Sequence, residues 1–237
     1  MKRNYNLDKF RGLTIISMVL FHLMYNINYY WPLEWYDGTL LNRMWQISIA
    51  GSFFLISGIS SNFLTADKNI KRGIKTSLIG FAITLITYIF APDQFILWGV
   101  LNGLGLSMII IGILQKYIDI NGKLFFVFFL LFIMTYRIPM GSLSEIDFFK
   151  KLYDKNIFVL GFPGANFSST DYFPIIPWLF IFISGYLFVK YIRNKNLDIS
   201  KGKDSILAKI GRQSMKIYLL HQIILYPLVS FIYNLTK

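Results

Sequence analysis

The two histidines of this chain each lie inside a long apolar stretch, and His22 is, with Asp171, a candidate catalytic residue. His22 is near the middle of residues 11–30, and His221 is in residues 214–235. An ionisable side chain is costly in hydrocarbon unless it stays neutral or faces a polar cavity. Because imidazole titrates near neutral pH, it is well suited to general base catalysis. We interpret His22 as catalytic, and a neutral histidine that is hydrogen-bonded between helices is the alternative.

An arginine precedes each histidine at helical spacing. Arg11 lies eleven residues before His22, close to three turns, so the two share a helix face and are roughly 16 Å apart. Arg212 lies nine residues before His221, roughly 13 Å along a helix. Guanidinium groups bind phosphate, and acyl-coenzyme A carries its phosphates and its reactive thioester at opposite ends of a long arm. This spacing favours an acyl-CoA site, although a single arginine at such a position more commonly sets membrane topology.

Tyr218 and His221 are three residues apart and share a helix face. If the first and last apolar stretches pack together, both histidines can line one cavity at comparable depth. A structural Tyr–His–Gln cluster that includes Gln222 explains His221 equally well.

Asp171 opens the sixth apolar stretch on the predicted outer side, in the segment Asp-Tyr-Phe-Pro-Ile-Ile-Pro-Trp of residues 171–178. It either caps the following helix or acts as a carboxylate that holds the hydroxyl or amine of an acceptor, or orients His22. Tyr172 and Trp178 are aromatic neighbours that suit a sugar. The two interpretations of Asp171 remain open.

Two strings of small residues, 51–61 and 99–107, predict close helix packing. A second interpretation places Ser57, Ser60 and Asn102 along a tunnel for the acyl donor. With two His and no Cys, the chain offers no metal site that can be argued from its residues.

The composition explains what positions these residues. Hydrophobic residues make up 55% of the 237 residues and charged residues 15%, and the charges cluster between apolar runs long enough to cross a bilayer. We predict an all-α, polytopic membrane helix bundle with a single domain over residues 1–237. The seven predicted spans are residues 11–30, 44–65, 74–92, 95–115, 122–138, 172–192 and 214–235.

The distribution of Lys and Arg predicts the orientation. With the N-terminus inside, 18 basic residues lie on the inner side and 6 on the outer side, so the C-terminus is outside. The net charge of +12 is then a topology signal, and it indicates anionic lipid headgroups rather than nucleic acid as partners. A basic inner loop (190–216) and a long outer loop (138–170) follow from this arrangement. The basic N-terminus lacks a small-x-small cleavage site, so we expect the first span to be retained.

The chain resembles a known family. Leu7-Asp8-Lys9-Phe10-Arg11-Gly12 with His22 is similar to the start of the acyltransferase-3 membrane proteins. Four further segments resemble the bacterial relatives of heparan-α-glucosaminide N-acetyltransferase, and nearly the whole chain is covered in order. They are residues 53–61, 97–107, 171–178 and 211–222.

The resemblance implies a multi-pass enzyme, expected in a bacterial plasma membrane, that moves an acyl group from cytoplasmic acetyl-CoA or another acyl-CoA to a saccharide or cell-envelope glycan. It implies His22 as the catalytic residue and Arg11 either near the coenzyme phosphates or as a residue that holds the site together. Because the larger relatives have ten or eleven spans, part of the acceptor site is either absent or supplied by a homo-oligomer.

From these patterns we predict the role of each site residue. His22 deprotonates the acceptor, which attacks the thioester directly, although a route through an acetyl-imidazole is also open. The acceptor is bound by Asp171, Tyr172, Trp178 and Asn26. The coenzyme is bound by Arg11, Arg212, His221, Ser57 and Asn102, with Lys9 or Lys216 also on its phosphates.

Two other classes of protein remain as alternatives. A small transporter or channel would use the histidines as a proton relay and would bind no coenzyme. A non-catalytic membrane scaffold would be indifferent to their substitution.

Overall fold

The computed structural model describes residues 3–195 and 202–236. Within these ranges the chain is all-helical apart from short turns, with seven helices long and apolar enough to cross a membrane, which confirms the predicted membrane bundle. The α-helices are α1 (Tyr5–Tyr30), α2 (Leu40–Asn62), α3 (Ala66–Phe90), α4 (Val100–Tyr117), α5 (Phe125–Thr135), α6 (Asp147–Asp154), α7 (Ile175–Asn194), α8 (Ile206–Arg212) and α9 (Ser214–Leu235).

Two compact units make up the chain, and the boundary between them falls inside α2. The first unit contains α1, the part of α2 through Ile56, α8 and α9. The second contains the rest of α2 from Ser57, together with α3 to α7. The prediction of a single domain remains a prediction, and each unit is described separately below.

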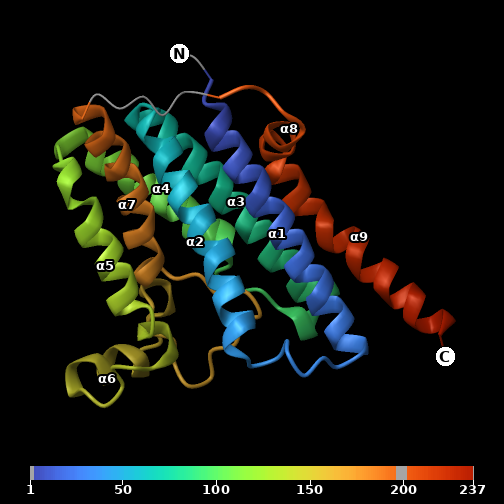
Figure 1. Ribbon diagram of the computed structural model, residues 1–237. Helices are drawn as coiled ribbons and strands as arrows, with labels where there is room; N and C mark the ends of the chain where they lie inside the picture. Colours follow the sequence, from blue (N-terminus) through green and yellow to red (C-terminus); the bar gives the residue numbers. More distant parts are fainter. Residues whose placement is uncertain (1–2, 196–201, 237) are drawn as a thin grey trace. The chain divides into compact units, whose positions relative to one another are not determined.

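In the first unit, α1 lies side by side with α8 and α9 (Figure 1). Asn4 is the N-cap residue of α1. Its side chain accepts a hydrogen bond from the Leu7 amide, which satisfies one of the free amides of the first turn. Buried Ile15 and Met18 of α1 and Ile49 of α2 form the core of this unit. Partly buried residues of α1, α2, α8 and α9 pack around them, which brings α9 against the face of α1 that carries His22.

Glycines allow the backbones of α1 and α8 to touch. A Cβ added at Gly12 of α1 would overlap the Leu207 carbonyl oxygen, and one added at Gly211 of α8 would overlap the Asp8 carbonyl oxygen. Only glycine fits at these two crossings. The chain then turns at Gln213 before α9 begins, so Arg212 and His221 lie on separate helices. The predicted continuous helical spacing between them is wrong, because α8 bends away to pack on α1.

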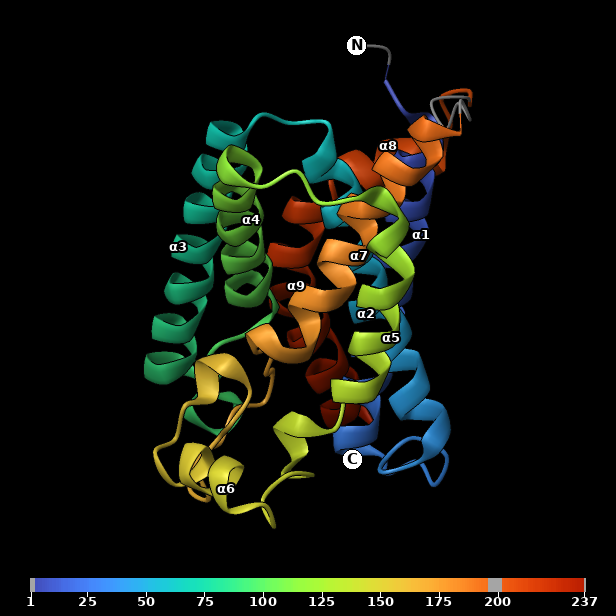
Figure 2. The same ribbon diagram turned by 90° about the vertical axis from the view of Figure 1, so that its left-hand side faces the viewer.

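In the second unit, α3 packs against α4 and α5 against α7 (Figure 2). A Cβ at Gly73 of α3 would lie 2.6 Å from the Gly105 carbonyl oxygen, and one at Gly105 would lie 2.7 Å from the Gly73 carbonyl oxygen. A Cβ added at Gly58 would likewise overlap the Phe182 carbonyl oxygen of α7. The predicted close packing of the small-residue strings is confirmed at these positions, whereas Gly51 has no neighbour within 4 Å.

The long segment between α5 and α7 is folded. It contains α6 and two single-turn 3₁₀ helices, and its own buried cluster is formed by Ile138, Tyr153 and Phe162. The Tyr153 hydroxyl donates to the Ile138 carbonyl and closes this cluster. The outer loop predicted from the sequence is therefore a packed substructure.

Three helices begin at least five residues away from the predicted start of their span. Helix α1 begins at Tyr5 rather than residue 11, and α3 begins at Ala66 rather than residue 74. Hydropathy marks the part of a helix that crosses hydrocarbon, and charged first turns extend beyond it. Helix α4 begins at Val100 rather than residue 95, because the preceding residues pair by backbone hydrogen bonds with residues 170–173.

The contact at Gly211 yields a prediction. Gly211→Ala should lower the stability of the first unit by about 1–3 kcal/mol, because a new methyl group would displace the Asp8 carbonyl. Gly51→Ala is the matched control. It should be neutral or slightly stabilising, since alanine is favoured in helices by about 0.5–1 kcal/mol. Melting temperatures in detergent micelles measure both changes, and equal melting temperatures would contradict the proposed crossing.

Candidate functional site

The first unit brings its two histidines together. The rings of His22 on α1 and His221 on α9 have centroids 4.7 Å apart. Helices α1 and α9 run side by side there, as Figure 1 shows. The two spans pack together, and the two histidines are in contact; that they line a cavity stays a prediction.

A chain of amides fixes one nitrogen of His22. Asn26 Nδ2 donates to Gln222 Oε1 over 2.9 Å, which leaves Gln222 Nε2 facing His22 Nδ1 at 3.1 Å. An amide nitrogen can only donate, so His22 Nδ1 accepts this hydrogen bond. The neutral ring of His22 therefore carries its proton on Nε2.

His221 has the opposite arrangement. Its Nδ1 lies 2.5 Å from the backbone carbonyl oxygen of Tyr218, one turn earlier on α9. A carbonyl oxygen can only accept, so Nδ1 carries the proton and Nε2 holds the lone pair. Nε2 is buried and has no hydrogen-bond partner within residues 3–195 and 202–236.

Aromatic residues form a wall beside His22. Phe21 and His22 meet edge to face with ring centroids 5.8 Å apart, and Phe21 also packs on Tyr36 and Trp45. The Tyr36 hydroxyl donates to the Phe21 carbonyl, and Trp45 Nε1 donates to Ser17 Oγ. Burial and the neighbouring Asp37 raise the pKa of the Tyr36 hydroxyl. These hydrogen bonds satisfy the polar atoms of the wall.

The two predicted phosphate ligands are already in ion pairs. Arg11 lies 3.2 Å from a carboxylate oxygen of buried Asp8, which also binds Arg3 at 2.7 Å. Arg212 binds Asp204 through both guanidinium nitrogens at 2.8 and 3.2 Å. The hydrogen bond from Arg212 holds the pKa of the Asp204 carboxyl below its usual value.

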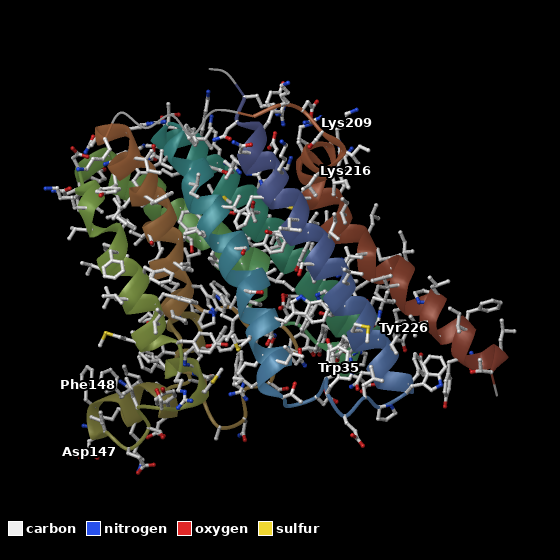
Figure 3. All side chains as sticks on the ribbon, viewed as in Figure 1. Trp35, Asp147, Phe148, Lys209, Lys216 and Tyr226 are labelled. Carbon is white, nitrogen blue, oxygen red and sulfur yellow. The ribbon has the colours of Figure 1, made fainter. Side chains whose placement is uncertain are left out.

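Three lysines at the same end of the unit lack such partners. Lys9, Lys209 and Lys216 form no ion pair within 4.0 Å with any described residue. Figure 3 shows Lys209 and Lys216 at the end of the unit where α1 begins. Among the described residues near the start of α1 and in α8, basic side chains outnumber Asp8 and Asp204, which gives a net positive charge that favours an anionic ligand.

In the second unit, Asp171 caps a helix other than the one predicted. Its Oδ2 accepts a hydrogen bond from the Val100 amide at 3.2 Å, at the start of α4, whereas Pro174 is the N-cap residue of α7. The interpretation that Asp171 caps the following helix is therefore wrong. Burial raises the pKa of the Asp171 carboxyl to about 6, and the hydrogen bond from Val100 partly opposes that rise.

Tyr172 and Trp178, predicted to bind the acceptor, take part in packing. The Tyr172 hydroxyl donates to the Phe158 carbonyl at 2.5 Å, and its ring packs on Phe167. Burial raises the pKa of that hydroxyl. Trp178 is buried against Phe132 and other aromatic rings.

Asn102 and Ser57, the predicted tunnel residues, lie in the second unit. Asn102 is fully buried on α4, and neither atom of its side-chain amide has a hydrogen-bond partner among the described residues. The nearby Trp98 Nε1 is likewise buried and unpaired within those ranges. Ser57 is partly buried on α2. No group of three or more His, Asp or Glu that could hold a metal is found among the residues described.

The fold and the histidine pair define an integral, multi-pass membrane protein with a buried polar centre. The chain belongs to the family of the heparan-alpha-glucosaminide N-acetyltransferase catalytic domain, whose model matches residues 3–223. No curated protein and no solved structure matches the chain significantly. Membership implies an acetyltransferase that uses acetyl-CoA.

Sequence reasoning missed three partners of the predicted residues. Gln222 was assigned only to a structural cluster, although it connects Asn26 to His22. Asp8 and Asp204, which pair with the predicted arginines, were not singled out. The spacing of Asp8 and Arg11 at i,i+3 was a usable signal, whereas a contact between Asn26 and Gln222 requires the tertiary fold.

Asp171 yields a prediction about pH. Its pKa is about 6 in the folded protein, above the usual value of about 3.9 for an unfolded chain. The folded state therefore binds the proton more tightly, and stability should fall as the pH rises from about 4 to about 6. Asp171→Asn should flatten this part of the curve of melting temperature against pH, while Asp147→Asn, at an exposed position on α6, should follow the parent. An unchanged slope in the Asp171 variant would contradict this account.

Proposed function

We propose that this protein transfers an acetyl group from cytoplasmic acetyl-CoA to a hydroxyl or amine of a saccharide on the outer side of the membrane. The supporting observation is the contact between His22 and His221, whose rings lie 4.7 Å apart inside two apolar helices. Two neutral imidazoles in contact can donate a hydrogen bond and accept a proton at one place. Acyl transfer to a poor nucleophile needs both functions.

The coenzyme phosphates would bind at the basic end of the first unit. Lys9, Lys209 and Lys216 form no ion pair within 4.0 Å among the described residues, and they lie on the same helices as, or next to, the paired Arg11 and Arg212. Along α1, eleven residues separate Arg11 from His22, roughly 16 Å of helix. An extended pantetheine arm would carry the thioester over that distance to the histidines.

Asp171 is the candidate acceptor ligand. Its carboxyl has a pKa of about 6, so it is largely ionised at neutral pH and can accept a hydrogen bond from a sugar hydroxyl or amine. Tyr172 and Trp178 would support this site through packing. Asn26 donates a hydrogen bond to Gln222 and would support His22 through it.

Transfer is proposed to be direct. The acceptor oxygen or nitrogen attacks the thioester carbonyl carbon, a proton passes to an imidazole, and CoA leaves as its thiol. An acetyl-imidazole intermediate would require an imidazole nitrogen with a free lone pair to attack first.

The first test measures CoA release from acetyl-CoA, with glucosamine as the acceptor, by protein in nanodiscs. A thiol-reactive dye reports only CoA, because the chain has no Cys. His22→Asn should lower the acceptor-dependent rate at least about 100-fold, as expected for loss of a group that acts in the transition state. Ile223→Ala, at an exposed position on α9, should behave like the parent.

Full activity in His22→Asn would remove this residue from the mechanism. Absence of acceptor-dependent release in the parent, together with proton flux across the vesicle membrane, would favour the transporter.

The second test measures acetyl-CoA affinity by calorimetry. The double variant Lys209→Glu/Lys216→Glu should raise the dissociation constant about tenfold or more, a loss of about 1.4 kcal/mol, because it replaces attraction to phosphate with repulsion. Added salt should weaken binding by the parent. Lys151→Glu on α6 is the control and should leave the affinity unchanged. Equal affinity of all three proteins would place the phosphates elsewhere.

A further inference from the structure

We propose that His221, rather than His22, accepts the proton in acyl transfer, and that His22 donates a hydrogen bond to the reacting carbonyl oxygen. This inference rests on the proposed function and deepens it. It assigns opposite roles to two side chains of the same kind, from the hydrogen bonds that fix their protons.

Nε2 of His22 cannot act as the base, because it already carries the proton of the neutral ring. The Nδ1 of this ring faces the Gln222 amide nitrogen at 3.1 Å, and turning that amide alone would break the 2.9 Å hydrogen bond from Asn26. Nε2 therefore bears the hydrogen and can only donate while the ring is neutral. A fixed N–H of this kind is the group that stabilises an oxyanion.

His221 has the complementary arrangement. Its Nδ1–H is held by the Tyr218 carbonyl, so the lone pair is on Nε2. The residue is 9% exposed, and Nε2 has no hydrogen-bond partner among the residues described. An acceptor atom buried without a partner is destabilising, and a substrate N–H or O–H in this position would satisfy it.

The Tyr218 carbonyl also prepares His221 to become charged. Once Nε2 takes a proton, the ring is an imidazolium whose Nδ1–H still donates to that carbonyl. His22 and Tyr218 are the titratable groups whose rings lie against His221, from α1 and from its own helix. Neither is a carboxylate, so neither forms an ion pair that would hold the imidazolium, which would return its proton readily.

In the proposed acyl transfer, His221 moves a proton and His22 only donates a hydrogen bond. The proton on the acceptor nitrogen or oxygen moves to His221 Nε2 while the acceptor atom bonds to the thioester carbonyl carbon. The carbonyl oxygen, now negative, accepts a hydrogen bond from His22 Nε2–H. The C–S bond then breaks, the carbonyl re-forms, and the CoA thiolate takes the proton from His221. His22 keeps its proton throughout.

Nitrogen NMR tests this assignment without any substrate. The chain contains only two His, so protein labelled with ¹⁵N-histidine in nanodiscs gives two ring systems, and His221→Asn assigns them. At a pH where both rings are neutral, we expect His221 with its proton on Nδ1 and His22 with its proton on Nε2. Finding both rings in one tautomer, or the two tautomers exchanged, would overturn the inference.

Gln222→Glu provides a sharper test. A carboxylate can only accept, so it should move the proton of His22 from Nε2 to Nδ1 and leave His221 unchanged. Ile223→Ala, next to it on the exposed side of α9, should alter neither ring. A His22 ring that keeps its Nε2 proton in Gln222→Glu would show that this amide does not set the tautomer.

Kinetics then separate the two roles in the acetyl-CoA and glucosamine assay. His221→Asn should lose at least about 100-fold in rate, and its rate should keep rising with pH where the parent reaches a plateau, because hydroxide replaces the missing base. His22→Asn should lose a comparable factor of about 10²–10³ yet keep the plateau. A plateau lost in His22→Asn and kept in His221→Asn would reverse the assignment.

These readouts distinguish the two proposals. The expected tautomers with no transfer in the parent would refute the acyltransferase function and, with it, the catalytic roles. Transfer in the parent with the opposite tautomers would refute only the division of roles between the histidines.

Discussion

The first unit depends on one partly buried amide, that of Gln222. In hydrocarbon each polar side chain must find its partner within the protein, and Gln222 satisfies this with both ends of its side chain, its oxygen to Asn26 and its nitrogen to His22. Both partners lie on α1, one turn apart, so the amide fixes the register of α9 against α1. A shift of either helix by one residue would break two hydrogen bonds and leave three polar groups unpaired.

The glycine crossing sets the other end of the same unit. Because α1 and α8 touch through Gly12 and Gly211, α8 lies against the start of α1, and its Arg212 interacts electrostatically with Asp8. The turn at Gln213 then directs α9 back along α1. The basic end and the histidine pair are thus held at a fixed separation by one continuous helix, α1, and a ligand that reaches both must have the length of that interval.

The sequence predicts the parts of this arrangement that depend on hydropathy and local spacing. Apolar length located the seven spans, and shared helix faces indicated that His22 and His221 could meet. Contacts between residues distant in sequence could not be predicted. Nothing in the residues before Asp171 indicates that its carboxylate caps α4 through Val100. The helix break between Arg212 and His221 was missed for the same reason, because it accompanies a tertiary contact between Gly211 and the backbone of α1.

The two histidines differ in what sustains their tautomers. His221 donates to a carbonyl one turn back on its own helix, so its tautomer follows from local helical geometry and persists as long as α9 is helical. His22 depends on an amide from another helix, so its Nε2–H is defined only while α1 and α9 are docked. The proton acceptor is set within one helix, whereas the donor is set by the docking of two helices. The oxyanion-stabilising function would therefore require the assembled unit, and the base would not. Loosening of the α1–α9 contact would then abolish the donor first, and leave a buried base with no fixed partner for the charge that its reaction creates.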